Sequence, residues 1–177
     1  MKIYQEIVLI LFLSLIFITS STSEKVETEK NERKIKRFIE MVELRNGYIE
    51  QQEFDYDLFV EYLKINGVKN REIVVSQAIL ETGTFTSNIF NKNNNLFGMK
   101  HPRVRPTTSQ GSNMGHAVYE HWTCSVKDYK HWYDYMTRNR EYDNYMAFLT
   151  NIGYAEDYNY LFKLRIIKER LLTEKTI

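Results

Sequence analysis

The sequence has one cysteine, two prolines and seven glycines, and it has no excess of either charge. A single cysteine, Cys124, excludes a disulfide within the chain, and its distance from the N-terminus excludes lipid attachment at a leader cleavage site. Few prolines and glycines argue against a linker-rich or all-β architecture. With 24 Lys and Arg against 23 Asp and Glu, the charge balance does not favour nucleic acid as a partner.

Signals for metals and cofactors are also missing. The four histidines have no close metal-ligand spacing and are joined by no second cysteine. No glycine-rich loop of the kind that cradles phosphates is present. The sequence therefore predicts no metal and no cofactor.

The N-terminus carries the longest apolar run, residues 7–18. This run is shorter than the ~20 residues that span a bilayer and within the ~7–15 of a signal-peptide core. Small residues follow it, so we predict a signal peptide over residues 1–22, cleaved between Ser20 and Glu24. A signal peptide usually begins with a net positive charge, but here the charge of Lys2 is offset by that of Glu6. An uncleaved membrane anchor is therefore the alternative. Either way, the sequence predicts an exported protein, periplasmic or extracellular.

Helical periodicity dominates the rest of the chain, and it predicts a mainly α fold of the α+β class. Residues 22–34 are polar without apolar period and are expected to form a linker, followed by a helix beginning near Ile35. Further helices are expected after a cap at Asp55 or Asp57, over residues 73–81, after a capping box at Ser125–Asp128, over 142–152, and after a cap at Asp157. Residues 99–119, which hold both prolines, are expected to form a loop or short hairpin.

Glu81 ends the apolar segment Gln77-Ala78-Ile79-Leu80-Glu81-Thr82-Gly83. Residues 73–80 are too apolar for a solvent-exposed helix, and Gly83 marks the end of that helix. Burial and the negative end of the helix dipole both favour a protonated Glu81. A general acid needs such a proton.

Four segments in order resemble the glucosaminidase family of peptidoglycan hydrolases, which includes flagellar and autolysin glucosaminidases with a lysozyme-like helical domain. They are Gln77–Gly83, Asn94-Asn95-Leu96-Phe97-Gly98-Met99-Lys100, Trp122–Tyr129, and Gly153-Tyr154-Ala155-Glu156-Asp157-Tyr158-Asn159-Tyr160. The resemblance covers roughly residues 50–172. It departs from the family at Tyr158, where many relatives carry proline.

The resemblance implies that Glu81 is catalytic and that Tyr154 lines the site. The predicted substrate contacts are Asn95, Phe97 and Tyr119, although the asparagines are expected mainly to build the turn that positions Phe97. Lys100, Arg103 and Arg105 form a basic cluster that could meet the carboxylates of peptide stems, or simply face solvent.

A second catalytic carboxylate is hard to find, because residues 101–117, where relatives often carry one, contain no Asp or Glu. Glu120 is the nearest downstream candidate. The alternative is that the N-acetyl group of the substrate acts as nucleophile, held by Tyr154. We favour the Tyr154 version.

The sequence thus predicts three parts: a signal peptide (1–22), a linker and N-terminal helix (23–49), and a glucosaminidase-like catalytic domain (50–177). The expected activity is cleavage of the β-1,4 bond after N-acetylglucosamine in bacterial peptidoglycan, with glycan strands as the partner and without stable membrane insertion once the leader is cleaved. A lytic transglycosylase or muramidase on the same fold is the nearest alternative. A glycan-binding module without turnover is the alternative from another class.

Overall fold

The computed structural model describes residues 22–174 and divides them into two compact units, with the boundary between Gly47 and Tyr48. The apolar run at residues 7–18 and the predicted signal peptide, except for Thr22, lie outside the described residues. Within residues 22–174, no helix is both long enough and apolar enough to cross a bilayer.

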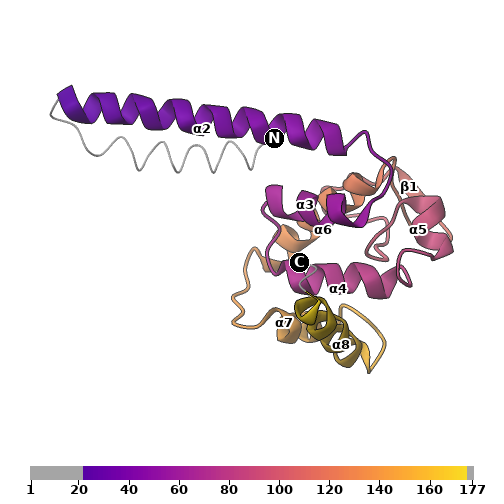
Figure 1. The fold of residues 1–177 in the computed structure, drawn as a ribbon. Coiled ribbons are helices and arrows are strands. Elements are labelled where there is room, and N and C mark those ends of the chain that lie inside the picture. The colour runs from indigo at the N-terminus through magenta and orange to yellow at the C-terminus, as the bar shows by residue number, and fades with distance from the viewer. Residues whose placement is uncertain (1–21, 175–177) are drawn as a thin grey trace. The chain divides into compact units, whose positions relative to one another are not determined.

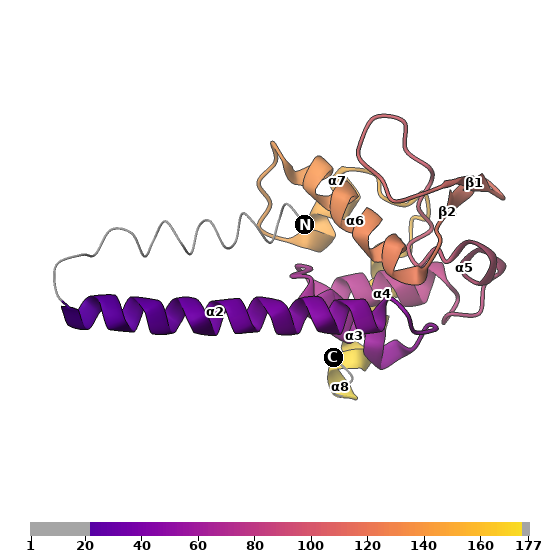
Figure 2. The same cartoon turned by 90° about the horizontal axis from the view of Figure 1, so that it is seen from above.

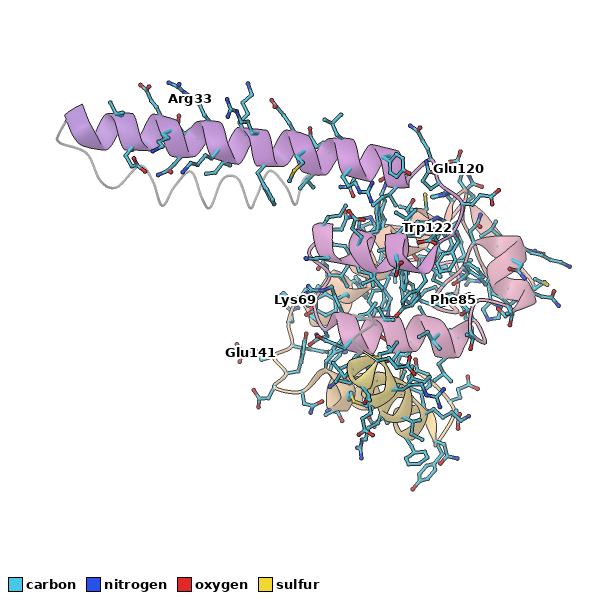
Figure 3. The ribbon with its side chains drawn as sticks, in the orientation of Figure 1. Arg33, Lys69, Phe85, Glu120, Trp122 and Glu141 are labelled. Atoms are coloured by element: carbon cyan, nitrogen blue, oxygen red, sulfur yellow. The ribbon has the colours of Figure 1, made fainter. Side chains whose placement is uncertain are left out.

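Helix α2 runs without interruption from Thr22 to Ile49. The prediction of a linker over residues 22–34 is therefore wrong. That segment lacks apolar period but is rich in Glu, Lys and Arg, which are good helix formers, and it contains neither Pro nor Gly. Arg33 and Glu29 form an exposed ion pair of 3.2 Å one turn apart, and Arg33 is labelled in Figure 3.

The unit that begins at Tyr48 is mainly helical, with one small sheet, which confirms the predicted α+β class (Figure 1). Its two strands are antiparallel, and Ser112 pairs with Ala117. Its elements after α2 are α3 (Tyr56–Ile65), α4 (Arg71–Glu81), α5 (Asn88–Asn93), β1 (Gly111–Asn113), β2 (His116–Val118), α6 (Trp122–Thr137), α7 (Tyr145–Asn151) and α8 (Tyr160–Thr173).

The start of α3 follows the sequence pattern, but the start of α6 does not. Asp55 caps α3 by accepting a hydrogen bond from the backbone N–H of Leu58, at 3.0 Å. Helix α6 already begins at Trp122, so the capping box predicted at Ser125 is wrong. Ser125 is fully buried, and its Oγ accepts a hydrogen bond from the backbone N–H of Leu96 at 3.0 Å. A distant segment therefore uses the side chain that the local pattern assigned to a cap.

The core of this unit is largely aromatic. Trp122 is 1% exposed and lies among the closely packed side chains of the interior (Figure 3). Its ring packs edge-on against Phe54 at 5.6 Å and against Tyr62 at 5.6 Å between centroids. Its Nε1–H donates to the carbonyl of Gln52, so the one polar atom of the indole is satisfied.

Two arrangements of elements position the site. Helix α8 packs against α4 (Figure 1), although the two helices lie far apart in the sequence. The β1–β2 hairpin lies beside α5 (Figure 2), and the backbone N–H of Ala117 donates to the carbonyl of Met99 at 2.8 Å. These contacts bring the segments around Glu81, Phe97 and Tyr160 to one side of the domain.

Candidate active site

Glu81 is the last residue of α4. The helix ends there because the following residues turn back on it: the backbone N–H of Thr82 donates to the carbonyl of Ala78, and that of Thr84 donates to the carbonyl of Ile79. Gly83 has φ +56°, a conformation that favours glycine and that commonly ends helices. The Glu81 side chain therefore leaves the helix at its carbonyl end.

The Glu81 side chain faces a cleft of about 710 Å³. Such a volume is within the ~300–1,000 Å³ typical of ligand sites. The wall comes from four segments that are distant in the sequence, namely the end of α4, residues 97–105, α6, and residues 152–160. The lining residues besides Glu81 are Leu80, Phe97, Gly98, Met99, Lys100, Pro102, Arg105, Trp132, Met136, Ile152, Gly153, Tyr154, Ala155, Glu156, Asp157 and Tyr160.

The pKa of Glu81 is raised above the usual value of a glutamate. Burial of the half-buried carboxyl is the main cause, because it disfavours the charged form. A hydrogen bond from Tyr160 and the charge of His116 act in the opposite direction and limit the rise. The group therefore keeps its proton to higher pH than an exposed glutamate does, as a general acid requires.

The turn Asn94–Lys100 approaches Glu81 through Gly98, whose φ is +62°. A Cβ added to Gly98 would lie 2.8 Å from Glu81 Oε2. Any larger residue there would strain the backbone and force the Glu81 carboxyl to move.

Asn95 holds this turn together from inside. The residue is 1% exposed, and its Nδ2 donates to the carbonyls of Met99 and Ala117 at 2.9 and 3.0 Å. Its Oδ1 accepts from the backbone N–H groups of Phe97 and Met99. Asn95 thus builds the turn and does not line the cleft, whereas Phe97, which is 2% exposed, does line it.

Tyr154 also lines the cleft, and its hydroxyl donates to the carbonyl of Phe97 at 3.3 Å. The bond connects the turn that holds Phe97 to the turn that follows α7. Burial raises the pKa of the Tyr154 phenol well above its usual value, so the group stays protonated. Trp132 packs edge-on against the Tyr154 ring at 5.0 Å and extends this aromatic wall.

The structure places Tyr119 and Glu120 outside the cleft lining. Tyr119 is 2% exposed, and its hydroxyl donates to Asp128 Oδ2 at 2.8 Å. Glu120 is exposed at the edge of the domain (Figure 3), and its backbone carbonyl accepts from Asn94 Nδ2. Of the residues predicted for the site, Glu81, Phe97 and Tyr154 line the cleft. Asn95, Tyr119 and Glu120 do not.

Arg105 is committed to a buried ion pair with Asp128, at 2.7 Å, and their side chains are 5% and 0% exposed. Burial alone would raise the pKa of Asp128, but hydrogen bonds from Arg105, Thr107 and Tyr119 hold it below its usual value. Of the basic cluster proposed from the sequence, only Lys100 and Arg103 are exposed. The ion pair between Arg105 and Asp128 instead connects the loop between Met99 and Gln110 to α6.

Among the cleft residues that sequence reasoning did not assign to the site are Trp132, Glu156, Asp157 and Tyr160. Trp132 lies on the apolar face of α6, and helical spacing alone does not separate a core face from a cleft wall. Glu156 and Asp157 belong to the segment that carries Tyr154, so their position next to that residue was the available signal. Among the described residues, no group of three or more His, Cys, Asp or Glu side chains is arranged to hold a metal ion.

Comparison with known proteins points to the same chemistry. The sequence matches the glucosaminidase family, described as mannosyl-glycoprotein endo-beta-N-acetylglucosaminidase, over residues 56–172. No curated protein and no solved structure matches the chain. The matched range holds all the residues that line the cleft and covers most of the chain. The chain belongs to the glucosaminidase family, a family of glycoside hydrolases that act on the glycan of peptidoglycan.

Proposed function

We propose that this protein is an endo-β-N-acetylglucosaminidase that hydrolyses the β-1,4 bond after N-acetylglucosamine in peptidoglycan, with Glu81 as the general acid. The observation that carries the proposal is a half-buried carboxyl with a raised pKa, at a helix end, facing a cleft of about 710 Å³ in a chain of this family. Protonation of the leaving oxygen is the step that this group can perform.

The second catalytic group is proposed to be the N-acetyl group of the substrate, held by Tyr154. The Tyr154 hydroxyl donates its only proton to Phe97, so its oxygen is left to accept a hydrogen bond. The acetamido N–H of the substrate is a suitable donor. Accepting a hydrogen bond from that N–H would direct the acetamido carbonyl oxygen toward the developing oxocarbenium ion, as substrate-assisted cleavage requires.

A protein carboxylate is the alternative second group, and the cleft favours Glu156 over Glu120 for that role. Glu156 is exposed and lines the cleft, whereas Glu120 does not line it. Asp157 also lines the cleft, but its Oδ2 is 2.6 Å from Lys163 Nζ and its Oδ1 accepts from the Asn159 backbone. Asp157 is therefore engaged in the turn that leads into α8.

Product analysis tests the proposal. Purified cell walls would be digested with the wild type and with Glu81→Gln, and the soluble muropeptides would be analysed by mass spectrometry after borohydride reduction. The proposed activity leaves N-acetylglucosamine at the new reducing end. N-acetylmuramic acid there would identify a muramidase, and an anhydro end would identify a lytic transglycosylase.

A lytic transglycosylase is the second candidate, because Glu81 is the only carboxyl of the cleft lining that is partly buried. A transglycosylase can work with one acid that also serves as base.

A binding module without turnover would release no fragments while still sedimenting with cell walls. The same digestion therefore separates all three functions.

Export accompanies this function, because peptidoglycan lies outside the cytoplasmic membrane. We propose that the apolar run at residues 7–18 directs secretion and that cleavage occurs between Ser20 and Glu24. N-terminal sequencing of the exported protein tests this. An intact Met1 on membrane-bound material would instead identify an anchor.

A further inference from the structure

The two tryptophans of the chain lie in different surroundings, although α6 carries both. Trp122 is 1% exposed, and its Nε1–H donates to the carbonyl of Gln52 at 3.1 Å. Trp132 is half-buried and lines the cleft. One helix therefore contributes a tryptophan to the core and a second tryptophan to the cleft.

The Nε1–H of Trp132 is a donor without a hydrogen-bond partner in the part of the chain that the structure describes. In that same part, the one buried polar side-chain atom that lacks a partner belongs to Tyr56. The Nε1 atom of Trp132 is therefore accessible to solvent. Trp132 can offer a ligand both an apolar ring and a hydrogen-bond donor.

Two tyrosine rings hold the indole of Trp132 in place. The Tyr154 ring packs edge-on at 5.0 Å, and the Tyr129 ring packs at a tilt at 5.3 Å between centroids. Tyr129 is itself 1% exposed, and its hydroxyl donates to Gln77 Oε1 at 2.6 Å. Core side chains thus fix the position of Trp132 before any ligand binds, which lowers the entropy that binding would cost.

Two further apolar side chains line the cleft together with Trp132. Met136 lies one turn after Trp132 on the same face of α6, and Ile152 directly follows α7. All three side chains are half-buried and pack against the core. The charged residues of the lining come from other segments, namely the end of α4 and residues 100–105 and 156–157. The cleft therefore has an uncharged, apolar part that is distinct from its charged walls.

We propose that Trp132, Met136 and Ile152 form a subsite that binds one N-acetylhexosamine ring of the glycan strand, with the Trp132 Nε1–H donating to a hydroxyl or acetamido oxygen of that sugar. This inference rests on the proposed function, and it adds a binding contact apart from Glu81 and Tyr154. A sugar ring has an apolar C–H face and oxygens at its rim. It therefore matches a surface that combines an aromatic ring with a single donor.

Other parts of peptidoglycan fit this subsite less well than a sugar does. The carboxylates of a stem peptide would lose water and gain no charged partner from Trp132, Met136 or Ile152. A purely apolar group would cover the Nε1–H without pairing it, and the unpaired donor would then weaken binding. A neutral sugar ring avoids both of these costs.

Tryptophan fluorescence tests the proposal without any need for turnover. The exported protein carrying Glu81→Gln would be titrated with peptide-free glycan strands, prepared from cell walls with an amidase. Because Trp122 is buried in the core, we expect the response to come from Trp132. Its emission should move to shorter wavelength and become shielded from acrylamide when the strands bind. Trp132→Phe should remove this response.

Affinities for the same strands measure the size of the contact. Trp132→Ala should weaken binding by about 30-fold, because the ring contact and the hydrogen bond are lost together. Trp132→Phe keeps an aromatic ring and should weaken binding by about fivefold, which covers a folding defect in the alanine variant. The matched control is Tyr135→Ala, which removes a half-buried ring of the same helix outside the cleft lining and should leave the affinity unchanged.

Several results would overturn the proposal. A fluorescence response that persists in Trp132→Phe would come from Trp122, and the absence of any response to the strands would exclude a sugar at Trp132. Equal losses of affinity in Trp132→Ala and Tyr135→Ala would point to general packing as the cause. A response to the free stem peptide, with none to the peptide-free strands, would assign the subsite to the peptide.

Kinetics separate this inference from the proposed function. Trp132→Phe should raise KM for the strands more than it lowers kcat, because the contact binds the substrate before and during the reaction. A response of Trp132 in a protein whose wild type releases no fragments would refute the glycosidase and leave the subsite intact. Normal release of fragments without a response of Trp132 would refute only the subsite.

Discussion

Gly98 lies so close to Glu81 that a Cβ placed on the glycine would be 2.8 Å from Glu81 Oε2. The two residues belong to separate segments, one at the end of α4 and the other in the turn that holds Phe97. This close approach limits where the Glu81 carboxyl can lie. The glycine therefore has a steric role at Glu81 in addition to its conformational role in the turn.

We expect Gly98→Ala to reduce turnover on purified cell walls by about 100-fold, because displacement of a catalytic group by about 1 Å costs that much. The matched control is Gly67→Ala. Gly67 has nearly the same φ, +64° against +62°, but an added Cβ there meets nothing within 4 Å. Both variants should lose about 1–2 kcal/mol of stability from backbone strain. Equal activities in the two variants would contradict a specific contact with Glu81.

Glu81→Gln should lower kcat by about 10²–10⁴-fold, because the amide cannot transfer a proton to the leaving oxygen. Fold and wall binding should remain, since the two side chains have the same shape. Initial rates of wall clearing and sedimentation of the protein with intact walls measure the two properties separately. Wild-type turnover by the folded variant would refute the role of Glu81.

The same substitution should make the protein more stable at neutral pH. Because burial raises the pKa of Glu81, the folded state holds its proton more tightly than the unfolded state does. The wild type therefore loses stability as pH rises from the usual glutamate pKa through the raised value, by about 1.4 kcal/mol per unit of pKa difference. Urea denaturation at pH 3 and pH 8 measures this: Glu81→Gln should gain stability over the wild type only at the higher pH.

Asp128→Ala should destabilise the domain by about 3–5 kcal/mol, because it leaves Arg105 charged and buried without its partner. The double variant Arg105→Met with Asp128→Asn removes both charges and should recover part of that loss. Lys127→Met is the control, since it breaks a half-exposed pair with Glu50 and should cost about 0–1 kcal/mol. Denaturation midpoints give the comparison, and similar losses in both single variants would contradict it.

Tyr154→Phe should lose most activity while Glu120→Gln loses little, if the substrate's N-acetyl group is the nucleophile. The phenylalanine variant lacks the oxygen that would accept the acetamido N–H, whereas Glu120 lies outside the cleft lining. Kinetics of both variants on one wall preparation decide between them. A loss in Glu156→Gln equal to that in Glu81→Gln would instead identify a protein carboxylate as the second group.

Sequence alone was sufficient for features that depend on neighbouring residues. The cap at Asp55, the end of the helix at Glu81 and the mainly helical class follow from local patterns, and the structure confirms them. Local reasoning failed where two local signals compete. Residues 22–34 lack apolar period but are rich in Glu, Lys and Arg, which are good helix formers, and the structure has a helix there.

Only the tertiary structure decided which side chains reach the cleft. Glu156 and Tyr160 line the same cleft as Glu81, where α8 packs on α4, and Arg105 forms an ion pair with Asp128 on α6. These contacts join residues more than twenty positions apart, and no local pattern specifies them. The sequence by itself singled out Glu81 and the helix that ends at it. The tertiary structure determined what surrounds Glu81, because burial and hydrogen bonding depend on segments that meet only in the folded chain.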